Sequence, residues 1–400
     1  MKPLDVLVIG AGPAGATTAL KLAQAGLAVG VVEKAVFPRR KVCGEFIGAA
    51  TWPVLRGLGL ARELLDAAGP VVRHVGLHAG EDCVTAPMPK PQESDAWGRA
   101  LGRDHLDSAL LDRAVATGAR LWQAFSAEAC TTDARGHVVT LVDRRGAPTE
   151  LRARVVVAAH GSWERGGLPT QALRAAKRGT DLIGFKAHFH GARLPEGLMP
   201  LVIFPGGYGG LVASDSGRTS FSCCVRRDAL RAIRRAHPGL DAGEALIVHV
   251  IESCRGVREA LEGARREAAW LSAGPIRPGV RALARGRVFS VGNAAGEAHP
   301  LVAEGIGMAI QSAWLLGEAL TGEGALSDAA LDRAGERYAA RWRANFTTRI
   351  HASAMFAALT GSRAGAAASA ALLQRVPRML TWGAWWSGKA NTLRTLEKAA

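Results

Sequence analysis

The sequence predicts an α/β fold built on a buried parallel sheet, and three observations predict it. Residues 6–9 form an uninterrupted apolar run, which is typical of a strand covered on both faces. A glycine-rich turn follows, and residues 16–25 then show a helical pattern that Gly26 closes. A second apolar run at residues 27–32 completes a strand–helix–strand unit.

The turn after the first strand has the spacing G-x-G-x-x-G, at Gly10, Gly12 and Gly15. In a dinucleotide site, these glycines permit a tight turn, a close approach of the backbone to pyrophosphate, and packing of the helix on the strand. The free N–H groups at the helix start, near Pro13 and Ala14, would then bind the phosphates.

An acid stands where such a site needs one. Glu33 ends the second strand at the expected offset of about 20 residues, where its carboxylate can accept a ribose hydroxyl. We expect Glu33 and the adjacent Lys34 to contact the nucleotide. The alternative is a glycine-rich turn without a chemical role.

Length, charge and cysteine content restrict the class of protein. The 400 residues suffice for one large or two interwoven domains, and we expect neither a signal peptide nor a membrane-spanning run. The six cysteines lack metal-ligand spacing, so we expect no metal site, reduced thiols and a cytoplasmic protein. The net charge is +15, but the arginines are spread along the chain, so nucleic acid is not an expected partner.

Two further stretches carry chemistry. The first is the basic loop at residues 37–46, which contains Lys41-Val42-Cys43-Gly44-Glu45. The second starts with an apolar strand that stops at Gly292-Asn293, continues through Pro300, and enters a helix at Gly305-Ile306-Gly307 that runs to about Leu320.

With the glycine fingerprint, these stretches resemble the FAD-dependent oxidoreductases that include the geranylgeranyl reductases. Those are similar to the p-hydroxybenzoate hydroxylase superfamily and the flavin-dependent halogenases. The resemblance covers residues 1 to about 316 and implies a Rossmann-like FAD-binding domain interrupted by a β-sheet domain that covers the substrate, followed by C-terminal helices. We assign residues 1–70, 95–180 and 275–330 to the FAD-binding domain, 71–94 and 181–274 to the cover domain, and 331–400 to the C-terminal helical region.

The resemblance also implies which residues contact FAD. Arg40 and Lys41 would neutralise the pyrophosphate, Cys43 and Gly44 would lie beside the flavin, and Arg103 would touch the ribityl or phosphate part. Asp104 is expected to cap the helix that follows. His160-Gly161 stands where the family commonly has Asp-Gly, which puts direct use of a nicotinamide in doubt. Asn293 replaces the family's aspartate on the ribityl chain, Pro300 would lie against the flavin ring, and the N–H groups of Gly305, Ile306 and Gly307 would face its pyrimidine end.

Catalytic and substrate roles are assigned to a few of these and neighbouring residues. Cys43, Pro300 and Gly305 are the candidate catalytic residues, and Phe204, Tyr208 and His188 are the candidate substrate contacts. His188 lies in a stretch that alternates with period two, in which Lys186, His188 and His190 share a face. We expect that face to be exposed and polar; a metal-binding or acid–base role is the alternative.

The leading functional hypothesis is an FAD-dependent monooxygenase that acts on a hydrophobic, aromatic or polyketide-like molecule. One alternative is a flavin-dependent reductase of isoprenoid or lipid double bonds, which the stretches 43–45 and 304–306 favour; another is an electron-relay flavoprotein. NADH, NADPH or a donor protein would supply electrons. The aromatic and basic stretch 377–386 is expected to pack on the core or close the cavity, with peripheral membrane contact as the alternative.

Overall fold

Two sheets organise the chain in the computed structural model, which describes residues 3–91, 96–162, 167–171, 176–324, 326–360, 363–389 and 393. The central sheet has five parallel strands in the order β19 (Val288–Ser290), β10 (Pro148–Ala158), β1 (Leu4–Ile9), β2 (Val29–Glu33) and β7 (Arg120–Gln123). Antiparallel strands β8 (Phe125–Asp133), β9 (Gly136–Asp143) and β18 (Ala284–Arg285) extend it. The predicted α/β fold is therefore confirmed.

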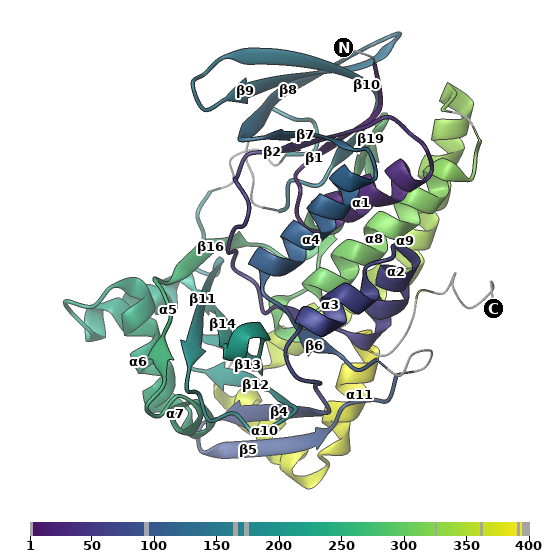
Figure 1. The fold of residues 1–400 in the computed structure, drawn as a ribbon. Helices are drawn as coiled ribbons and strands as arrows, with labels where there is room; N and C mark the ends of the chain where they lie inside the picture. The colour runs from purple at the N-terminus through teal and green to yellow at the C-terminus, as the bar shows by residue number, and fades with distance from the viewer. Residues whose placement is uncertain are drawn as a thin grey trace.

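Helices cover one face of this sheet and a hairpin covers the other. Helices α1 (Pro13–Gln24), α4 (Arg103–Ala116) and α8 (Gly305–Thr321) pack on β1, β2 and β10, and α9 (Asp328–Thr360) packs behind α8 (Figure 1). The β8–β9 hairpin shares an apolar cluster with the opposite face of β1 and β10. Both faces are thus buried, which explains the continuous apolar strands.

The second sheet lies below the first in Figure 1 and joins two distant parts of the chain. Its main strands are β11 (Leu182–His190), β14 (Thr219–Arg226), β13 (Gly207–Ala213), β12 (Leu198–Phe204), β4 (His74–Ala79) and β5 (Asp82–Pro87), in that order. Since β4 pairs in parallel with β12, residues 74–87 and 182–226 form one cover sheet. The predicted interruption of the FAD-binding fold by a β-sheet is confirmed, while the domain boundaries we assigned stay predictions.

The cover sheet is itself covered on both faces. Helices α5 (Arg227–Ala236), α6 (Ala242–Ser253) and α7 (Arg255–Ala260) pack on one face. Helices α10 (Arg363–Arg375) and α11 (Arg378–Trp386) pack on the other face beside β4 and β5. The face that carries α10 and α11 is also the face that meets the central domain.

Shorter elements connect these layers. They are β3 (Phe46–Ile47), η1 (Ala49–Thr51), α2 (Trp52–Gly57), α3 (Ala61–Ala67), β6 (Arg99–Ala100), η2 (Asp215–Gly217), β15 (Arg265–Arg266), β16 (Leu271–Ile276), β17 (Gly279–Val280), η3 (Gly292–Ala294), β20 (Gly296–Glu297) and η4 (Pro300–Val302). Strand β16 pairs with β11 at the edge of the cover sheet.

Three local expectations are corrected. Helix α1 begins at Pro13 rather than at residue 16, because proline is well tolerated at the first helical position. Helix α4 is preceded by Gly102, so Asp104 is not its N-cap; the Asp104 carboxylate instead accepts a hydrogen bond from Arg218. Phe204 packs toward α6, with its ring 6.2 Å from that of His249, because neighbouring strand residues face opposite sides and Ile203 faces inward.

Candidate active site

A cavity of about 460 Å³ lies between the central domain and the cover sheet. The starts of α1, α4 and α8 and the loop at residues 39–46 form its walls on the central side. Strands β12, β13 and β14 form the opposite wall. Both glycine-rich stretches and the basic loop, which lie far apart in sequence, therefore border one space.

The glycine turn leaves room for phosphate at one end of this cavity. A Cβ added to Gly12 would meet only the tips of two cationic side chains, at 3.6 Å from Arg103 Nη2 and 3.9 Å from Arg39 Nη2. Gly10, with φ +102°, and Gly15 instead have packing roles: a Cβ on Gly15 would lie 1.8 Å from the Gly10 carbonyl oxygen. Pro13 and Ala14 also line the cavity, but Gly15 does not.

The groups around this space fit an anionic nucleotide. Glu33 accepts hydrogen bonds from the backbone N–H groups of Ala11 and Ala35, both at 2.8 Å, which fixes its carboxylate on the cavity wall beside Lys34. Arg39 lies 3.6 Å from Glu33, yet its buried Nε and Nη1 make no hydrogen bond within the described residues. Unused guanidinium donors beside a helix start are suited to a pyrophosphate.

The basic loop presents Arg39 and Lys41 to the cavity rather than Arg40 and Lys41. Arg40 is not among the residues that line the cavity, although its buried Nε and Nη2 also make no hydrogen bond within the described residues, so its contact with the cofactor stays a prediction. Burial, together with the charges of Arg39 and Arg103, lowers the pKa of Lys41 to about 8. A bound phosphate would counter this effect.

The second glycine-rich stretch borders the other part of the cavity. Gly292, Asn293, Pro300, Gly305 and Ile306 all line it, and a Cβ on Gly305 would meet no atom within 4 Å. Gly307 lies outside the lining, where an added Cβ would be 3.0 Å from Thr51 Oγ1 and 3.2 Å from Glu304 Oε2; its contact with the flavin stays a prediction. His160 and Gly161 line the cavity, with His160 Nε2 3.0 Å from the Thr170 hydroxyl.

Buried carboxylates support this stretch. The Asn293 side-chain amide donates to Glu297 at 2.8 Å, which leaves the amide oxygen of Asn293 available as an acceptor. Glu304, just before α8, pairs with Lys389 near the C-terminus, with Nζ and Oε1 3.1 Å apart and both side chains buried. The Lys389 carbonyl also accepts a hydrogen bond from the Ala50 N–H group.

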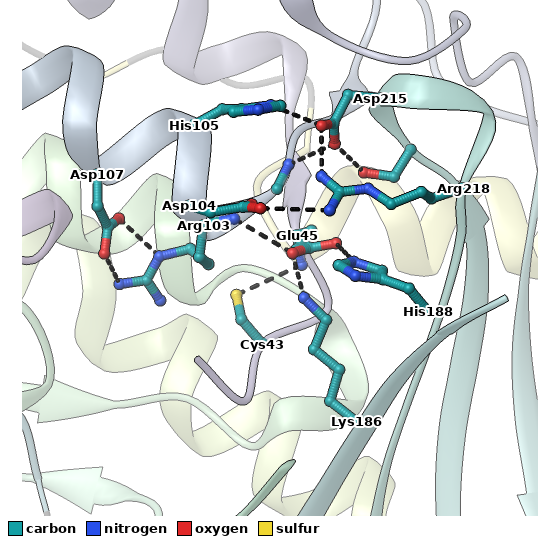
Figure 2. A network of polar contacts seen from close by, with 12 residues as sticks. Cys43, Glu45, Arg103, Asp104, His105, Asp107, Lys186, His188, Asp215 and Arg218 are labelled. Carbon is teal, nitrogen blue, oxygen red and sulfur yellow. Dashed lines mark hydrogen bonds and ion pairs between the residues drawn. The ribbon is translucent and has the colours of Figure 1, made fainter. Parts of the chain in front are cut away.

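A buried ion cluster joins the basic loop to the cover sheet. Glu45 lies between Lys186 and His188 of β11, and all three are almost fully buried (Figure 2). His188 Nε2 is 2.7 Å from Glu45 Oε2, and Lys186 Nζ contacts Oε1. Burial alone would raise the pKa of Glu45, but the hydrogen bond from His188 and the charge of Lys186 lower it to about 2. The carboxylate is therefore ionised at neutral pH.

This cluster corrects our expectation for the polar face of β11. The period-two pattern placed Lys186 and His188 on one face as expected, but that face is buried against the loop rather than exposed, and only His190 is exposed. His188 is not a cavity-lining residue, so it is no substrate contact; its second ring nitrogen faces Glu267 at 3.4 Å.

Glu45 fixes the turn that carries Cys43. Its backbone is left-handed (φ 63°), a conformation that costs a non-glycine residue about 1–3 kcal/mol. Its N–H group donates to Cys43 Sγ at 3.3 Å, and its carboxylate accepts from the Arg103 N–H group at 3.2 Å. Gly44 lies against β14, where an added Cβ would be 3.3 Å from Ser222 Oγ. The Cys43 thiol is thereby held where the central domain meets the cover sheet.

A second polar cluster repeats this connection on the outer side. Asp215 accepts from the Gly102 N–H group at 2.7 Å and pairs with Arg218, and Arg218 also reaches Asp104 at 3.2 Å (Figure 2). His105 approaches Asp215 at 2.6 Å from the exposed side. The start of α4 is thus tied to the cover sheet at two points, close to Arg103 in the cavity.

The remaining part of the cavity is apolar. Tyr208 lines it, with its ring 4.8 Å from that of His299. Burial lowers the pKa of His299 to about 4, so the ring is neutral at neutral pH, and its buried Nδ1 makes no hydrogen bond within the described residues. The apolar side chains on this wall are Met199, Leu201, Leu211, Val212, Ile276 and Leu301.

Comparison with known protein families shows which family this chain belongs to. The FAD-binding domain family matches residues 3–347, which is most of the chain. This protein belongs to that family. The cationic, glycine-lined end of the cavity is suited to hold the pyrophosphate of FAD.

Curated relatives include reductases and a monooxygenase. A menaquinone reductase of Mycobacterium tuberculosis is 36% identical over 162 residues, or 40% of this chain and only 38% of that protein. Digeranylgeranylglycerophospholipid reductase 2 of Methanopyrus kandleri is 26% identical over 364 residues, or 86% of this chain and 83% of that protein. Tetracenomycin A2 monooxygenase-dioxygenase of Streptomyces glaucescens is 32% identical over 183 residues, or 40% of this chain and 32% of that protein.

Solved structures share the fold. A myxobacterial chondrochloren halogenase superposes with a TM-score of 0.73 at 24% identity, over 86% of this chain and 80% of that one. A geranylgeranyl bacteriochlorophyll reductase-like protein from Thermoplasma acidophilum gives a TM-score of 0.68 at 18% identity, over 99% and 94%. These likenesses agree with the fold family that the sequence resembled.

Sequence reasoning missed several residues of the site. Arg39 stands in the loop that was singled out, but the loop's conformation decides which cation faces the phosphate. Lys186 and Glu45 are 141 residues apart, so no local pattern joins them. The only sign of this cluster in the sequence is Lys186, which stands on a strand that alternates with period two and has an apolar opposite face.

We expect Gly12→Val to remove FAD without unfolding the protein. The added side chain enters space that only the tips of Arg39 and Arg103 border, so the apoprotein should keep its fold while the flavin-to-protein absorbance ratio falls at least about tenfold. As a contrast, Gly15→Val should prevent folding because its Cβ overlaps the Gly10 carbonyl. Stoichiometric FAD in the Gly12 variant would contradict the site assignment.

We expect FAD binding to take up a proton at alkaline pH. Lys41 has a pKa near 8 before binding, and phosphate charge raises it, so binding at pH 8.5 should take up about three quarters of a proton and weaken as the pH rises further. Calorimetric titrations in two buffers of different ionisation enthalpy measure this uptake. The Lys41→Arg variant keeps the charge and should show almost none; equal uptake in both proteins would refute the role of Lys41.

We expect Glu45→Gln to destabilise the protein by about 3–5 kcal/mol at pH 7, because Lys186 and His188 lose their buried counter-charge. The folded-state pKa of Glu45 is depressed, so this stabilisation is present above about pH 4.5 and is lost as the pH falls toward 2.

Denaturant unfolding at several pH values tests this, and the difference between wild type and variant should shrink below pH 4.5. Asp133→Asn is the matched control, since its ion pair with Arg152 is exposed and screened by water. A Glu45→Gln protein as stable as wild type at pH 7 would show that the contacts of Glu45 with Lys186 and His188 do not stabilise the fold.

Proposed function

We propose that this protein is an FAD-dependent reductase that saturates a carbon–carbon double bond in a lipophilic molecule of isoprenoid type. The observation that carries the proposal is the position of the Cys43 thiol. It lines the cavity between the glycine-rich cofactor wall and the apolar wall of the cover sheet, and the Glu45 cluster fixes its turn. Saturation of a double bond needs one proton donor at that position.

The apolar wall suits a lipophilic substrate. Met199, Leu201 and Val212 extend from the cover sheet, and Ile276 and Leu301 border the same end of the cavity. Burying an isoprenoid chain against such side chains stabilises the complex by about 25 cal/mol per Å² of apolar surface removed from water. The cationic end, by contrast, is taken up by the cofactor's phosphates.

The chain supplies binding, orientation and one proton. FAD, when bound and reduced, supplies hydride chemistry. Cys43 Sγ–H would donate a proton to one carbon of the double bond, and the resulting thiolate would recover its proton from water. Arg103 and Lys186 lie near Sγ and balance the negative charge that appears on it. Tyr208 and the neutral ring of His299 shape the wall beside the reacting carbons.

Relatives support the reductase over the alternatives. The digeranylgeranylglycerophospholipid reductase matches across most of both chains, whereas the monooxygenase relative matches about two fifths of this one. The sequence alone favoured a monooxygenase acting on an aromatic or polyketide-like molecule. The position of the Cys43 thiol and the apolar wall of the cavity instead favour the reductase.

A monooxygenase is the second candidate function. The pair of aromatic rings at Tyr208 and His299 suits an aromatic substrate, and the tetracenomycin monooxygenase relative supports this chemistry. Electrons would come from NADH, NADPH or a reduced electron-transfer protein in either case. The basic net charge of +15 suits an acidic donor protein.

Mass spectrometry of the product distinguishes the two functions. Purified enzyme reduced with dithionite and incubated without oxygen with a geranylgeranyl lipid or a prenylated quinone should yield product heavier by two hydrogens. Product heavier by one oxygen, formed only in air, would replace the reductase with the monooxygenase.

We expect Cys43→Ser to slow this reduction by about 10²–10⁴-fold, because a hydroxyl is a far weaker acid than a thiol. FAD content and the rate of flavin reduction by dithionite should stay unchanged, since serine can accept the same hydrogen bond from the Glu45 N–H group. Cys83→Ser, at an exposed cysteine, is the control. An unchanged turnover rate in the Cys43 variant would remove the thiol from the mechanism.

A further inference from the structure

The last three helices expose an unusual set of apolar side chains. Eleven large hydrophobic residues are exposed in the described part of the chain. Six of them lie on α9, α10 and α11, and a seventh, Val376, directly follows α10. They are Met355, Leu359, Leu372, Val376, Trp382, Trp385 and Trp386, which we call the C-terminal apolar surface. Trp382 and Trp386 are each about 60% exposed (60% and 62%). Monomeric proteins seldom expose such groups without a partner.

The spacing of these residues gives each helix an outward apolar stripe. Met355 and Leu359 are four residues apart on α9. Leu372 of α10 is four residues before Val376, which directly follows the helix and donates its N–H to the Leu372 carbonyl. On α11, Trp382 is three and four residues from Trp385 and Trp386. Residues at these spacings share a helix face. The expectation that the tryptophans pack on the core is therefore corrected.

Helices α10 and α11 are apolar on their inner faces too. Leu373, Leu380 and Ala384 are buried in the cluster that joins these helices to the cover sheet. Gln374 and Thr381 fix the helices to β5 through hydrogen bonds to Asp82 and Pro87. A surface helix that has already buried one apolar face needs no second one for folding, so the outward stripes are available for a contact outside the protein.

The charge of residues 337–396 indicates what kind of partner the C-terminal apolar surface contacts. Residues 337–396 contain no aspartate or glutamate, although the chain as a whole has 35 acids. Its cations are Arg337, Arg341, Arg343, Arg349, Arg363, Arg375, Arg378, Lys389 and Arg394. Arg375 and Arg378, between the stripes of α10 and α11, are exposed. Tryptophan and arginine together are the composition of a membrane–water interface.

We propose that the C-terminal apolar surface docks on a lipid bilayer that contains anionic headgroups. Tryptophan rings would enter the interfacial layer while Arg375 and Arg378 contact the lipid phosphates. No described helix is long and apolar enough to cross a bilayer, so the contact is peripheral. A symmetric contact with a second copy would bring two acid-free, cationic segments together, which charge repulsion opposes.

The position of the surface relates it to the cavity. Met199 and Val212 line the cavity and belong to the same apolar cluster as Leu373 and Leu380 of α10 and α11. On α9, Phe356 packs with Tyr208 and Leu301, which also line the cavity. A lipophilic molecule in the bilayer would thus be presented near the apolar wall. The docking itself does not depend on the reaction catalysed.

Vesicle flotation with the full-length, FAD-loaded protein tests the proposal without any turnover. Wild type should float with vesicles of phosphatidylcholine and phosphatidylglycerol, with at least about tenfold less protein on phosphatidylcholine alone. Trp382→Ser combined with Trp386→Ser should reduce binding about tenfold, and Arg375→Glu combined with Arg378→Glu should abolish the preference for anionic vesicles. Circular dichroism and FAD content verify that each variant is folded.

Leu240→Ser combined with Val280→Ser is the matched control, because these side chains are also exposed but lie outside the C-terminal helices. It should bind vesicles like wild type. Wild type that stays unbound with both vesicle types, or a tryptophan variant that binds like wild type, would overturn the proposal. So would a wild-type dimer that the tryptophan variant converts to a monomer, since a second copy would then cover the surface.

Discussion

One buried carboxylate sets the spacing between the two halves of this protein. Glu45 belongs to the loop that follows the nucleotide-binding unit, while Lys186 and His188 belong to the cover sheet. Removing three such groups from water is costly, and only their mutual contacts offset that cost. The three side chains therefore tolerate little displacement. Glu45 also has a strained, left-handed backbone, and in that conformation its N–H group donates to Cys43 Sγ and holds Cys43 in place. The width of the cavity between the halves follows from this contact.

The cavity that results is divided by charge. Arg39, Lys41 and Arg103 gather at the glycine turn. The nearby acids Glu33 and Asp107 already pair with Arg39 or Arg103 or accept from backbone N–H groups. The opposite wall offers hydrocarbon and a neutral imidazole. The anionic cofactor and the lipophilic substrate that we propose would thus occupy separate places, and the flavin ring would lie at the boundary, where the thiol is.

The sequence predicted what depends on local chemistry and missed what depends on distant partners. Glycine spacing and apolar runs identify the nucleotide unit because turn geometry and strand burial are encoded within about 30 residues. We expected Phe204 to line the cavity, but it lies on the opposite face of the cover sheet. Strand periodicity separates the two faces of a strand and does not show which of them borders the cavity. Lys186 and His188 were assigned to solvent because their counter-ion is far along the chain. The exposure of Trp382 and Trp386 likewise depends on which face of α11 packs against the cover sheet, and local sequence does not determine that.

The pairing of Glu304 with Lys389 has a consequence for folding. It joins the start of α8 to a residue 85 positions further along the chain, and the Lys389 carbonyl also accepts a hydrogen bond from the Ala50 N–H group. Contacts between residues so far apart in sequence carry a loop-closure cost that local contacts do not, so we expect them to form after the strand–helix–strand unit of the glycine turn. The cavity wall at Gly305 thus reaches its final position only when the helices that follow α8 have packed.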